Sequence, residues 1–472
     1  MTTGNNLVHS QNFMTRALSV FTEVRVNELR LTLTLFAIIF LMMTAYYIAK
    51  PVRDSWLAVS LIGNLSRIEV KAVSGLFQSL VLIALLPSYS KLYDKLPRGK
   101  LLIWVNLFFI TLFPVFWLLR PGNFMESIPC IGVIFYVWIG IFSVTVVAQL
   151  WAFAADLFDE NAGKRLFPLI ALGASTGAVV GSMLSNYLIR GAGINIYTML
   201  LIAPCILAIT TFLLWRCDNK HNGDKTDTNK NNVDAKDTQT ETDKTSAWKI
   251  IFGDRYILLI ALFIFMLNWV VTNGENILFA AIQDAIALTD MSHLSAEEAN
   301  IAVGQATAEF YTRIYFWISL VGMLLQAFVV SRLLKYGGMK TVLLVPPFVS
   351  LASYGTMTGS GGLQSLTVAK TAENATNFSV GNTALNLLWL PVPKEALYKA
   401  KTAIDTAFVR TADAMAAITV IFGTRVCNIS VEGFLILNII LISVWLYVVF
   451  LIIKERNKVA DTPTGAALGA RT

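Results

Sequence analysis

The feature that most constrains this chain is a succession of long apolar stretches, each close to the about 20 residues that a helix needs to cross a bilayer. Charged residues make up only 14% of the 472 positions, and hydrophobic residues make up 56%. A soluble globule carries roughly a quarter charged residues to cover its surface. Because so few charges cannot cover a water-facing surface, lipid must cover it. We therefore predict an all-α integral membrane protein.

The apolar stretches predict twelve transmembrane helices in two six-helix halves. The first stretch is too long for a cleavable signal peptide and lacks a cleavage site. The expected spans cover residues 31–52, 68–88, 101–119, 128–155, 166–188, 195–215, 256–283, 309–331, 341–358, 364–391, 402–424 and 432–453.

Lys and Arg are concentrated in alternate loops, which predicts the orientation. The count places both termini in the cytoplasm, and the longest opposite loop, 284–308, has no Lys or Arg. The membrane that we expect for such a protein is a bacterial inner membrane. The net charge of +7 therefore reflects topology and predicts no nucleic-acid partner. The expected domains are a cytoplasmic N-terminal segment 1–30, a bundle 31–215, a disordered cytoplasmic linker 216–250, a bundle 251–454 and a tail 455–472. The linker has almost no apolar side chains with which to fold.

The two halves resemble each other in sequence. Phe142-Ser143-Val144 precedes Trp151, and Phe378-Ser379-Val380 precedes Trp389 at a similar offset. Membrane bundles built from such repeats bind their cargo near the midplane, between the repeats. We therefore expect the functional site between the two halves.

Charged side chains at bilayer depth are costly and mark functional sites by default. The first span ends with Lys50, Arg53 and Asp54, which lie one turn apart and share a helical face. Pro51 among them frees a backbone carbonyl, as expected where a helix lines a cavity. The alternative is that Lys50 and Arg53 extend to the outer headgroups.

The seventh span contains Asn273, Gly274 and Glu275. A glycine between an amide and an acid predicts a local break in the helix, with the carboxylate facing the cavity. The alternative is a structural hydrogen bond to a neighbouring helix. Small residues serve a different purpose in the fifth span, where glycines recur every four residues from Gly173 to Gly181. That spacing predicts a face for close helix packing.

The tenth and eleventh spans add further ionisable residues. One face of the tenth span carries polar residues at helical spacing, Lys370, Glu373 and Asn377. Such a face cannot contact lipid, so we expect it to line an aqueous path or a partner helix. Lys370 and Glu373 are also close enough to pair. Arg410 and Asp413 lie one turn apart in the eleventh span. A guanidinium presents a planar fork suited to carboxylate or phosphate.

The sequence does not contain the residue patterns expected for a histidine proton relay, a metal site or a phosphate-binding loop. The three histidines lie in polar segments, and the four cysteines have no metal-ligand spacing. No phosphate-binding loop of the G-x-x-x-x-G-K-[ST] type occurs. We therefore expect no enzyme activity, no metal and no cofactor, and we expect any transport to use a solute or ion gradient.

The loop after the second span carries Asp94, Lys95, Arg98 and Lys100. This pattern resembles the cytoplasmic loop signature of the major facilitator superfamily. The resemblance implies twelve helices in two halves, with Asp94 and Arg98 holding a cytoplasmic gate.

Several stretches resemble a narrower family, the ATP/ADP translocases of intracellular bacteria and plastids with their bacterial relatives. These stretches are Lys50-Pro51-Val52-Arg53-Asp54, Trp151-Ala152-Phe153, Lys164 to Leu169, Leu172-Gly173-Ala174, Asn273-Gly274-Glu275 and Lys399-Ala400-Lys401-Thr402-Ala403-Ile404-Asp405. The resemblance implies nucleotide exchange and a functional glutamate at Glu275. The position of Asp405 near the cytoplasmic end of the eleventh span separately suggests a gating ion pair with Lys401. Ile139-Gly140-Ile141 stands where the family has a glutamate, and Asn377 stands in a region where it has charged residues.

Two main hypotheses follow. In the first, Lys50, Arg53, Lys370 and Arg410 bind an anionic organic solute, such as ATP, ADP or a smaller and less charged molecule, through charge-assisted hydrogen bonds. Carboxylates of Asp54, Glu275, Glu373 and Asp413 would pair with these cations when the site is empty, which favours exchange. In the second, one of these carboxylates titrates in a proton-driven porter for a metabolite, siderophore or drug. A membrane-bound sensor is a third possibility. We expect the protein to act as a monomer in the lipid bilayer.

Overall fold

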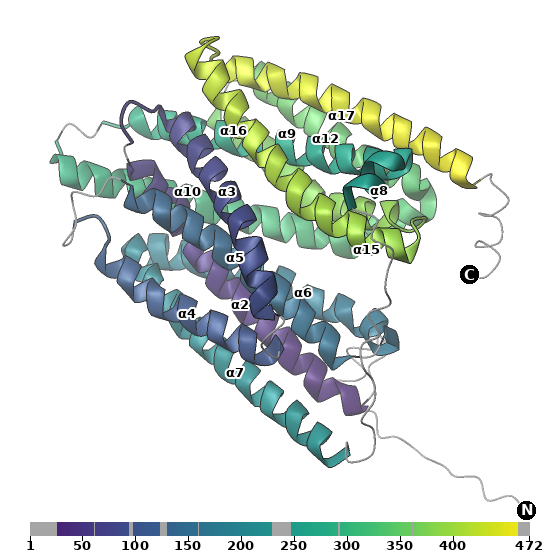
Figure 1. Ribbon diagram of the computed structural model, residues 1–472. Coiled ribbons are helices and arrows are strands. Elements are labelled where there is room, and N and C mark those ends of the chain that lie inside the picture. Colours follow the sequence, from purple (N-terminus) through teal and green to yellow (C-terminus); the bar gives the residue numbers. More distant parts are fainter. Residues whose placement is uncertain are drawn as a thin grey trace, which may run out of the picture.

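The fold was examined in a computed structural model, which describes residues 26–60, 62–93, 98–122, 130–158, 160–228, 247–290, 293–360 and 362–460. Throughout these residues the regular secondary structure is helical, which confirms the predicted all-α class. The helices run roughly alongside one another in two groups (Figure 1). The start of α2, at Val26, and the end of α17, at Ala460, lie at the same end of the bundle. We call that end proximal and the opposite end distal.

The first half contains six long helices. Their bounds are α2 (Val26–Val59), α3 (Arg67–Tyr93), α4 (Arg98–Leu118), α5 (Ile131–Leu157), α6 (Glu160–Asn186) and α7 (Met199–Thr228). A π-helical turn, Tyr187–Gly191, extends α6, and a short turn, Ile196–Thr198, leads into α7.

The second half repeats this arrangement with more interruptions. After a short helix α8 (Ala247–Gly253) come α9 (Arg255–Ala287), α10 (Ala296–Leu324), α11 (Val330–Arg332), α12 (Gly338–Ser360), α13 (Leu363–Thr376), α14 (Asn382–Leu388), α15 (Lys394–Ala403), α16 (Val409–Arg425) and α17 (Val431–Ala460). Single π-helical turns connect α10 to α11, α11 to α12, α13 to α14 and α15 to α16. Such turns are common at functional sites.

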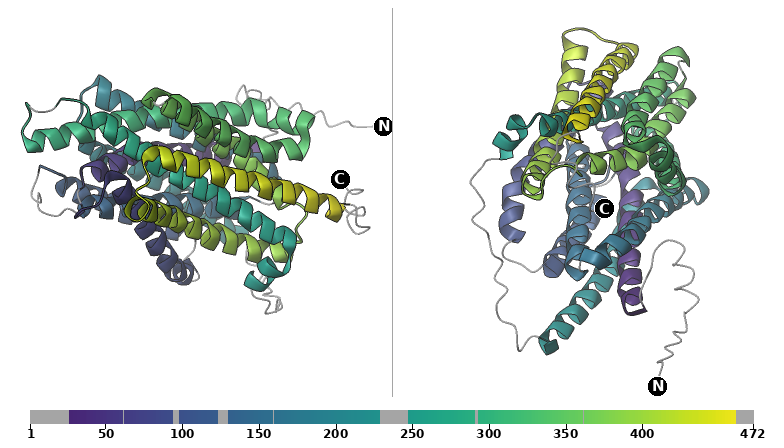
Figure 2. Two further views of the ribbon diagram at one scale, coloured as in Figure 1. Left: turned by 90° about the horizontal axis from the view of Figure 1, so that it is seen from above. Right: turned by 90° about the vertical axis from the view of Figure 1, so that its right-hand side faces the viewer.

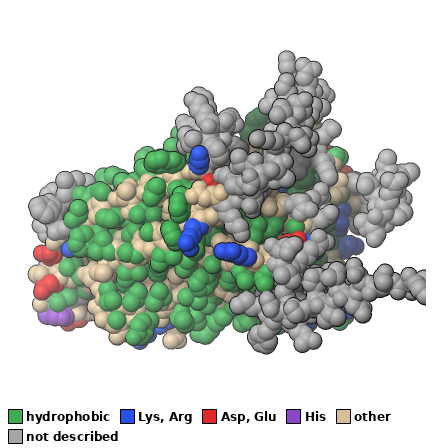
Figure 3. All heavy atoms as spheres, turned by 90° about the horizontal axis from the view of Figure 1, so that it is seen from below, with side chains coloured by type: hydrophobic (Ala, Val, Ile, Leu, Met, Phe, Trp, Pro, Cys, Tyr) green, Lys and Arg blue, Asp and Glu red, His purple; other side chains and the backbone are tan. Residues whose placement is uncertain are grey.

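Among the described residues, ten stretches are long and apolar enough to cross a membrane. One of them, Glu297–Gly359, contains two successive helices that reverse at Gly338, where φ is 65°. The α13–α14 segment is not among the ten, because its polar residues lower its mean hydropathy. Hydrophobic side chains are widespread on the described part of the face in Figure 3, as contact with lipid requires.

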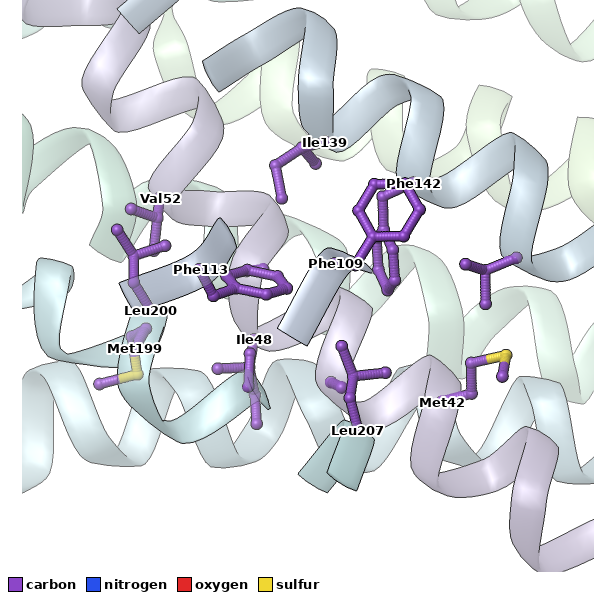
Figure 4. Close-up of a cluster of buried hydrophobic side chains, with 14 of the residues drawn as sticks. Met42, Ile48, Val52, Phe109, Phe113, Ile139, Phe142, Met199, Leu200 and Leu207 are labelled. Carbon is purple, nitrogen blue, oxygen red and sulfur yellow. The ribbon is translucent and has the colours of Figure 1, made fainter. Parts of the chain in front are cut away.

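The first half is held by an aromatic and aliphatic core between α2, α4, α5 and α7 (Figure 4). Phe113 and Phe142 are buried at its centre, and Trp138 packs edge-on against Phe113, with ring centroids 4.8 Å apart. On the other side of α2, the glycines of α6 make the predicted close contact. A Cβ at Gly177 would meet the Phe40 carbonyl oxygen, so no larger residue fits.

Both ends of the segment 216–250, for which a linker was expected, are helical. Helix α7 continues to Thr228, and α8 begins at Ala247; residues 229–246 lie outside the described part. The buried carboxylate of Asp218 lies against Gly99 in the first turn of α4. A negative charge is stabilised at a helix N-terminus, so this contact favours the packing of α7 against the start of α4.

The two halves pack together most closely toward the distal end. One buried cluster there contains residues of both halves, including Leu57 and Val137 with Ile277 and Ile314. The hydroxyl of Ser55 in α2 donates to the Gly304 carbonyl of α10, at 2.7 Å. Nearer the proximal end, the described buried cluster of the second half contains only second-half residues. Viewed from the proximal end, the halves form two separate groups of helices (Figure 2).

Candidate functional site

The last third of α2 presents a buried charge cluster toward the second half. Helix α2 continues through Pro51, and the spacing of its residues places Arg53 and Asp54 at the junction with α3 and α10. The Asp54 carboxylate is fully buried, 3.0 Å from Arg53 Nη2 and 2.5 Å from Lys71 Nζ. The Tyr315 hydroxyl of α10 also donates to it, at 2.8 Å. Two cations therefore share one carboxylate, which leaves an excess positive charge.

Lys71 is a site residue that the sequence analysis did not include. It lies in the first turns of α3 and is only 4% exposed. It falls inside the expected span 68–88. Its ammonium also lies over the rings of Tyr136 and Phe279, at 4.8 and 5.2 Å from the centroids. A lysine within an apolar span was the signal that could have identified it.

Lys50 lies apart from these carboxylate contacts, among aromatic rings. Its Nζ is 3.8 Å from the centroid of the Tyr315 ring, 5.2 Å from that of Tyr47 and 5.8 Å from that of Tyr46. Cation–π attraction stabilises an ammonium in such a cage. The Lys50 ammonium therefore has aromatic partners within the bundle.

The second half carries a matching cluster on α9 and α13. Lys370 and Glu373 are almost fully buried and pair at 2.7 Å, as their spacing predicted. Glu275 of α9 lies further from Lys370, at 4.0 Å, and accepts a hydrogen bond of 2.7 Å from Asn374. With a side chain 28% exposed, Glu275 is the accessible member of this cluster.

The expected break at Gly274 does not occur, because α9 is continuous from Arg255 to Ala287. The glycine allows a close approach of neighbouring helices instead. A Cβ at this position would collide with the Tyr354 hydroxyl of α12 and the Lys370 ammonium of α13. Gly274 therefore makes room for the buried lysine beside Glu275.

A third charged pair comes from α16. Arg410 Nη1 lies 3.0 Å from Asp413 Oδ2, as their spacing suggested. Asp413 also accepts a hydrogen bond of 2.8 Å from Thr272 in α9 and one of 3.3 Å from Ser79 in α3. The Ser79 contact crosses between the halves, so Asp413 connects the two walls of the site.

Two expected site residues have other surroundings. Asn273 is fully buried, and its amide nitrogen donates to Asn438 of α17, at 2.7 Å. This is the helix–helix hydrogen bond that the sequence analysis gave as the alternative to a binding role. Asn377 begins the π-helical turn after α13, and both of its amide atoms are buried without a hydrogen-bond partner among the described residues.

A cavity of about 140 Å³ lies between the two halves at this level. Its volume has room for on the order of ten water molecules. Its lining residues are Arg53, Lys71, Ala72, Gly75, Gln78, Ser79 and Tyr136 from the first half, with Thr272, Glu275, Asn276 and Asp413 from the second. The cations of the lining come from the first half and its carboxylates from the second. Lys50, Lys370, Glu373 and Arg410 contact charged or aromatic partners nearby but do not form this lining.

The expected proximal gate is described only in part. Asp94 and the side chain of Arg98 lie outside the described residues. Lys401 lies in the last turn of α15, one turn before Asp405, which is exposed in the π-helical turn Ile404–Phe408.

A clear contact between the halves lies at the distal end, where the sequence analysis proposed none. Arg425 Nε at the end of α16 is 2.5 Å from Glu69 Oε1 at the start of α3, and the Thr424 hydroxyl donates to the same oxygen at 2.8 Å. Arg425 Nη2 also donates to the Asn64 carbonyl, at 2.7 Å. We call Glu69 and Arg425 the distal pair. They join positions 356 residues apart in sequence, so no local spacing indicates their contact.

The sequence matches the family model described as Major Facilitator Superfamily over residues 33–393. The chain belongs to this superfamily. Its two-half helical fold agrees with the match, and secondary transport is the activity class of that fold. A comparison with curated protein sequences gave no match.

Solved structures show the same fold at low sequence identity. An auto-inhibited POT family peptide transporter superposes with a TM-score of 0.60 at 11% identity, covering 90% of this chain and 96% of that one. A bacterial homologue of the iron transporter ferroportin, in an inward-facing state, gives 0.56 at 13% identity, covering 89% and 99%. The nucleoside transporter NupG gives 0.51 at 12% identity, covering 90% and 98%. These likenesses concern the fold alone.

Proposed function

We propose that this major facilitator protein is an alternating-access carrier of a small organic solute with a negatively charged group. The observation that carries the proposal is the pairing of Arg53 and Lys71 with one carboxylate, Asp54, at the wall of a cavity between the halves. An anionic group entering the cavity would supply the second partner that these cations lack. Charge-assisted hydrogen bonds of this kind are stronger than neutral ones and favour a carboxylate or phosphate.

The same contacts suggest how binding is coupled to movement. Asp54 accepts from Tyr315, which belongs to the other half. A solute anion that binds Arg53 and Lys71 would draw these cations away from Asp54. The Asp54–Tyr315 hydrogen bond, which joins the two halves, would then lie in a different electrostatic environment. When the cavity is empty, Asp54 neutralises part of the positive charge and keeps the halves together. An exchanger behaves in this way, because its loaded form crosses between states more readily than its empty form.

The identity of the solute is part of the proposal. The resemblance of residues 50–54 and 399–405 to ATP/ADP translocases makes nucleotides the first solutes to test. The pairing of Lys370 with Glu373 and of Arg410 with Asp413, together with the small cavity, favours a smaller and less charged solute. The Lys and Arg distribution supports a cytoplasmic location for the proximal end, and we propose a bacterial inner membrane as the site of transport. The close packing of the distal end would then represent a state closed toward the outside.

Exchange can be tested with the purified protein in liposomes. Vesicles loaded with unlabelled solute should take up the labelled solute in the presence of an uncoupler, and empty vesicles should take up much less. ATP and ADP would be tested beside organic phosphates and carboxylates. Absence of uptake for every anionic solute, in protein shown to be folded, would contradict the proposal.

A proton-driven porter is the second candidate, favoured by one observation. The Glu275 carboxylate reaches the cavity, while the nearest cation, Lys370, is engaged 2.7 Å from Glu373. Glu275 is therefore the residue on which this second candidate rests. Uptake into empty vesicles that requires a pH gradient and is abolished by the uncoupler would favour this candidate over exchange.

A further inference from the structure

The cavity walls carry opposite charges. The first-half wall contains Arg53 and Lys71 with the single carboxylate of Asp54 behind them. The second-half group contains the carboxylates Glu275, Glu373 and Asp413 against the two cations Lys370 and Arg410. Among the residues that line the cavity, the charged side chains of the first half are the cations Arg53 and Lys71 and those of the second half are the carboxylates Glu275 and Asp413, so the two walls have charges of opposite sign. A solute with only negative groups would satisfy the first wall and be repelled by the second.

Two hydrogen-bonding atoms at the cavity lack partners within the described part of the chain. Arg53 Nε is a buried donor on the first wall, and Gln78 Oε1 is a buried acceptor beside it. A buried polar atom without a partner costs free energy, so a bound group that satisfies it is favoured. Arg53 Nε would be satisfied by a hydrogen-bond acceptor on the solute. Gln78 Oε1 would be satisfied by a hydrogen-bond donor, which a carboxylate or a fully ionised phosphate cannot supply.

Glu275 is the carboxylate best placed to meet a cationic group. Its side chain is 28% exposed, compared with 17% for Asp413, which already accepts from Arg410, Thr272 and Ser79. Glu275 has the neutral amide of Asn374 as its close partner. A solute ammonium would therefore find an accessible carboxylate without displacing a guanidinium.

From these walls we infer that the transported solute is a small zwitterion, whose anionic group binds Arg53 and Lys71 and whose ammonium group binds Glu275 with Gln78 Oε1 nearby. The inference rests on the proposed function and narrows its substrate class. The cavity of about 140 Å³ fits a molecule of amino-acid size better than one of nucleotide size. Because the two walls belong to different halves, such a solute also joins the halves when it binds.

Matched ligands test the inference on the full-length protein. Thermal shift and titration calorimetry would compare α-amino acids and linear amino acids, from glycine to aminohexanoate, with their N-acetyl and carboxamide derivatives. At neutral pH the parent compounds carry both charges, and each derivative retains only one. We expect at least one parent zwitterion to bind, and both of its derivatives to bind roughly tenfold to a hundredfold more weakly, as the loss of a charge-assisted hydrogen bond implies.

Two variants connect the result to the residues. Glu275→Gln should reduce binding of the zwitterion to the level of its N-acetyl derivative, with binding of the N-acetyl derivative unchanged or tighter. The control is Glu432→Gln, which removes an exposed carboxylate from the start of α17 and should bind both ligands as the wild type does.

The outcomes separate the two proposals. If N-acetyl derivatives, simple carboxylates or nucleotides bind and are exchanged at least as well as every zwitterion, the solute is only an anion; the proposed function then stands and the zwitterion inference is wrong. If no compound with a negative group binds, both are wrong. Equal loss of zwitterion and N-acetyl binding in Glu275→Gln would also overturn the role given to Glu275.

Discussion

Glu69 and Arg425 form an ion pair of 2.5 Å that joins the start of α3 in the first half to the end of α16 in the second. The Glu69 side chain is 3% exposed, whereas that of Arg425 is 48% exposed. The pair lies at the distal end, beyond the cavity, and shares Glu69 with the Thr424 hydroxyl. Any opening of the cavity toward the distal end must separate these groups.

We predict that Arg425→Ala shifts the protein toward a distally open state. The change leaves the buried Glu69 without its cation, while Ser66 and Thr424 still donate to it. The readout is alkylation of a cysteine placed at Ala72, a cavity residue 2% exposed, in a background with the four natural cysteines replaced by serine. Arg425→Ala should raise the alkylation rate several-fold, and Arg190→Ala, an exposed distal control, should not. Equal rates in both variants would mean that the pair does not hold the distal end closed.

The cationic wall gives a second prediction. Arg53→Ala and Lys71→Ala should each reduce uptake by about tenfold to a hundredfold, because each removes a charge-assisted bond to the anionic group. Arg120→Ala serves as the control, since Arg120 contacts Trp117 at the end of α4, away from the cavity. Uptake would be measured at matched protein levels in liposomes. Normal uptake by Lys71→Ala would remove Lys71 from the site.

The buried pair of α13 gives a prediction about stability. Lys370→Met leaves Glu373 buried without its partner at 2.7 Å, which should destabilise the protein by about 3–5 kcal/mol. The double variant Lys370→Met/Glu373→Leu removes both charges and should recover most of that loss. Thermal unfolding in detergent, followed by tryptophan fluorescence, measures the difference. A double variant no more stable than Lys370→Met would show that the pair does not act as a unit.

Close packing between α2 and α6 gives a fourth prediction. Gly177→Ala places a methyl group against the Phe40 carbonyl and should destabilise the first half by about 1–3 kcal/mol, the usual cost of overpacking. Gly355→Ala is the matched control, since a Cβ there meets no neighbouring atom within 4 Å. Both variants would be compared by thermal unfolding. A stable Gly177→Ala protein would contradict the required close approach.

The sequence predicts well those features that depend on one helix at a time. Hydropathy alone places most of the long helices, and helical spacing alone pairs Lys370 with Glu373 and Arg410 with Asp413. The glycine spacing of α6 likewise predicts its contact with α2.

Features that depend on contacts between helices are harder to predict. Lys71 joins Asp54 only when α3 packs against α2, and Asn273 meets Asn438 from the last helix. The continuous backbone at Gly274 has the same origin, because the space that glycine provides is filled by Tyr354 and Lys370 from other helices. A glycine between polar residues fits a break and a close approach equally well until its neighbours are known.

The most direct test of the account is a structure of the protein with its transported solute bound. We predict that the anionic group lies within hydrogen-bonding distance of both Arg53 and Lys71, with the opposite end of the solute against Glu275 of the second half. A solute bound elsewhere in the bundle, or one that leaves Arg53 and Lys71 on Asp54 alone, would contradict the central claim that these cations receive the cargo.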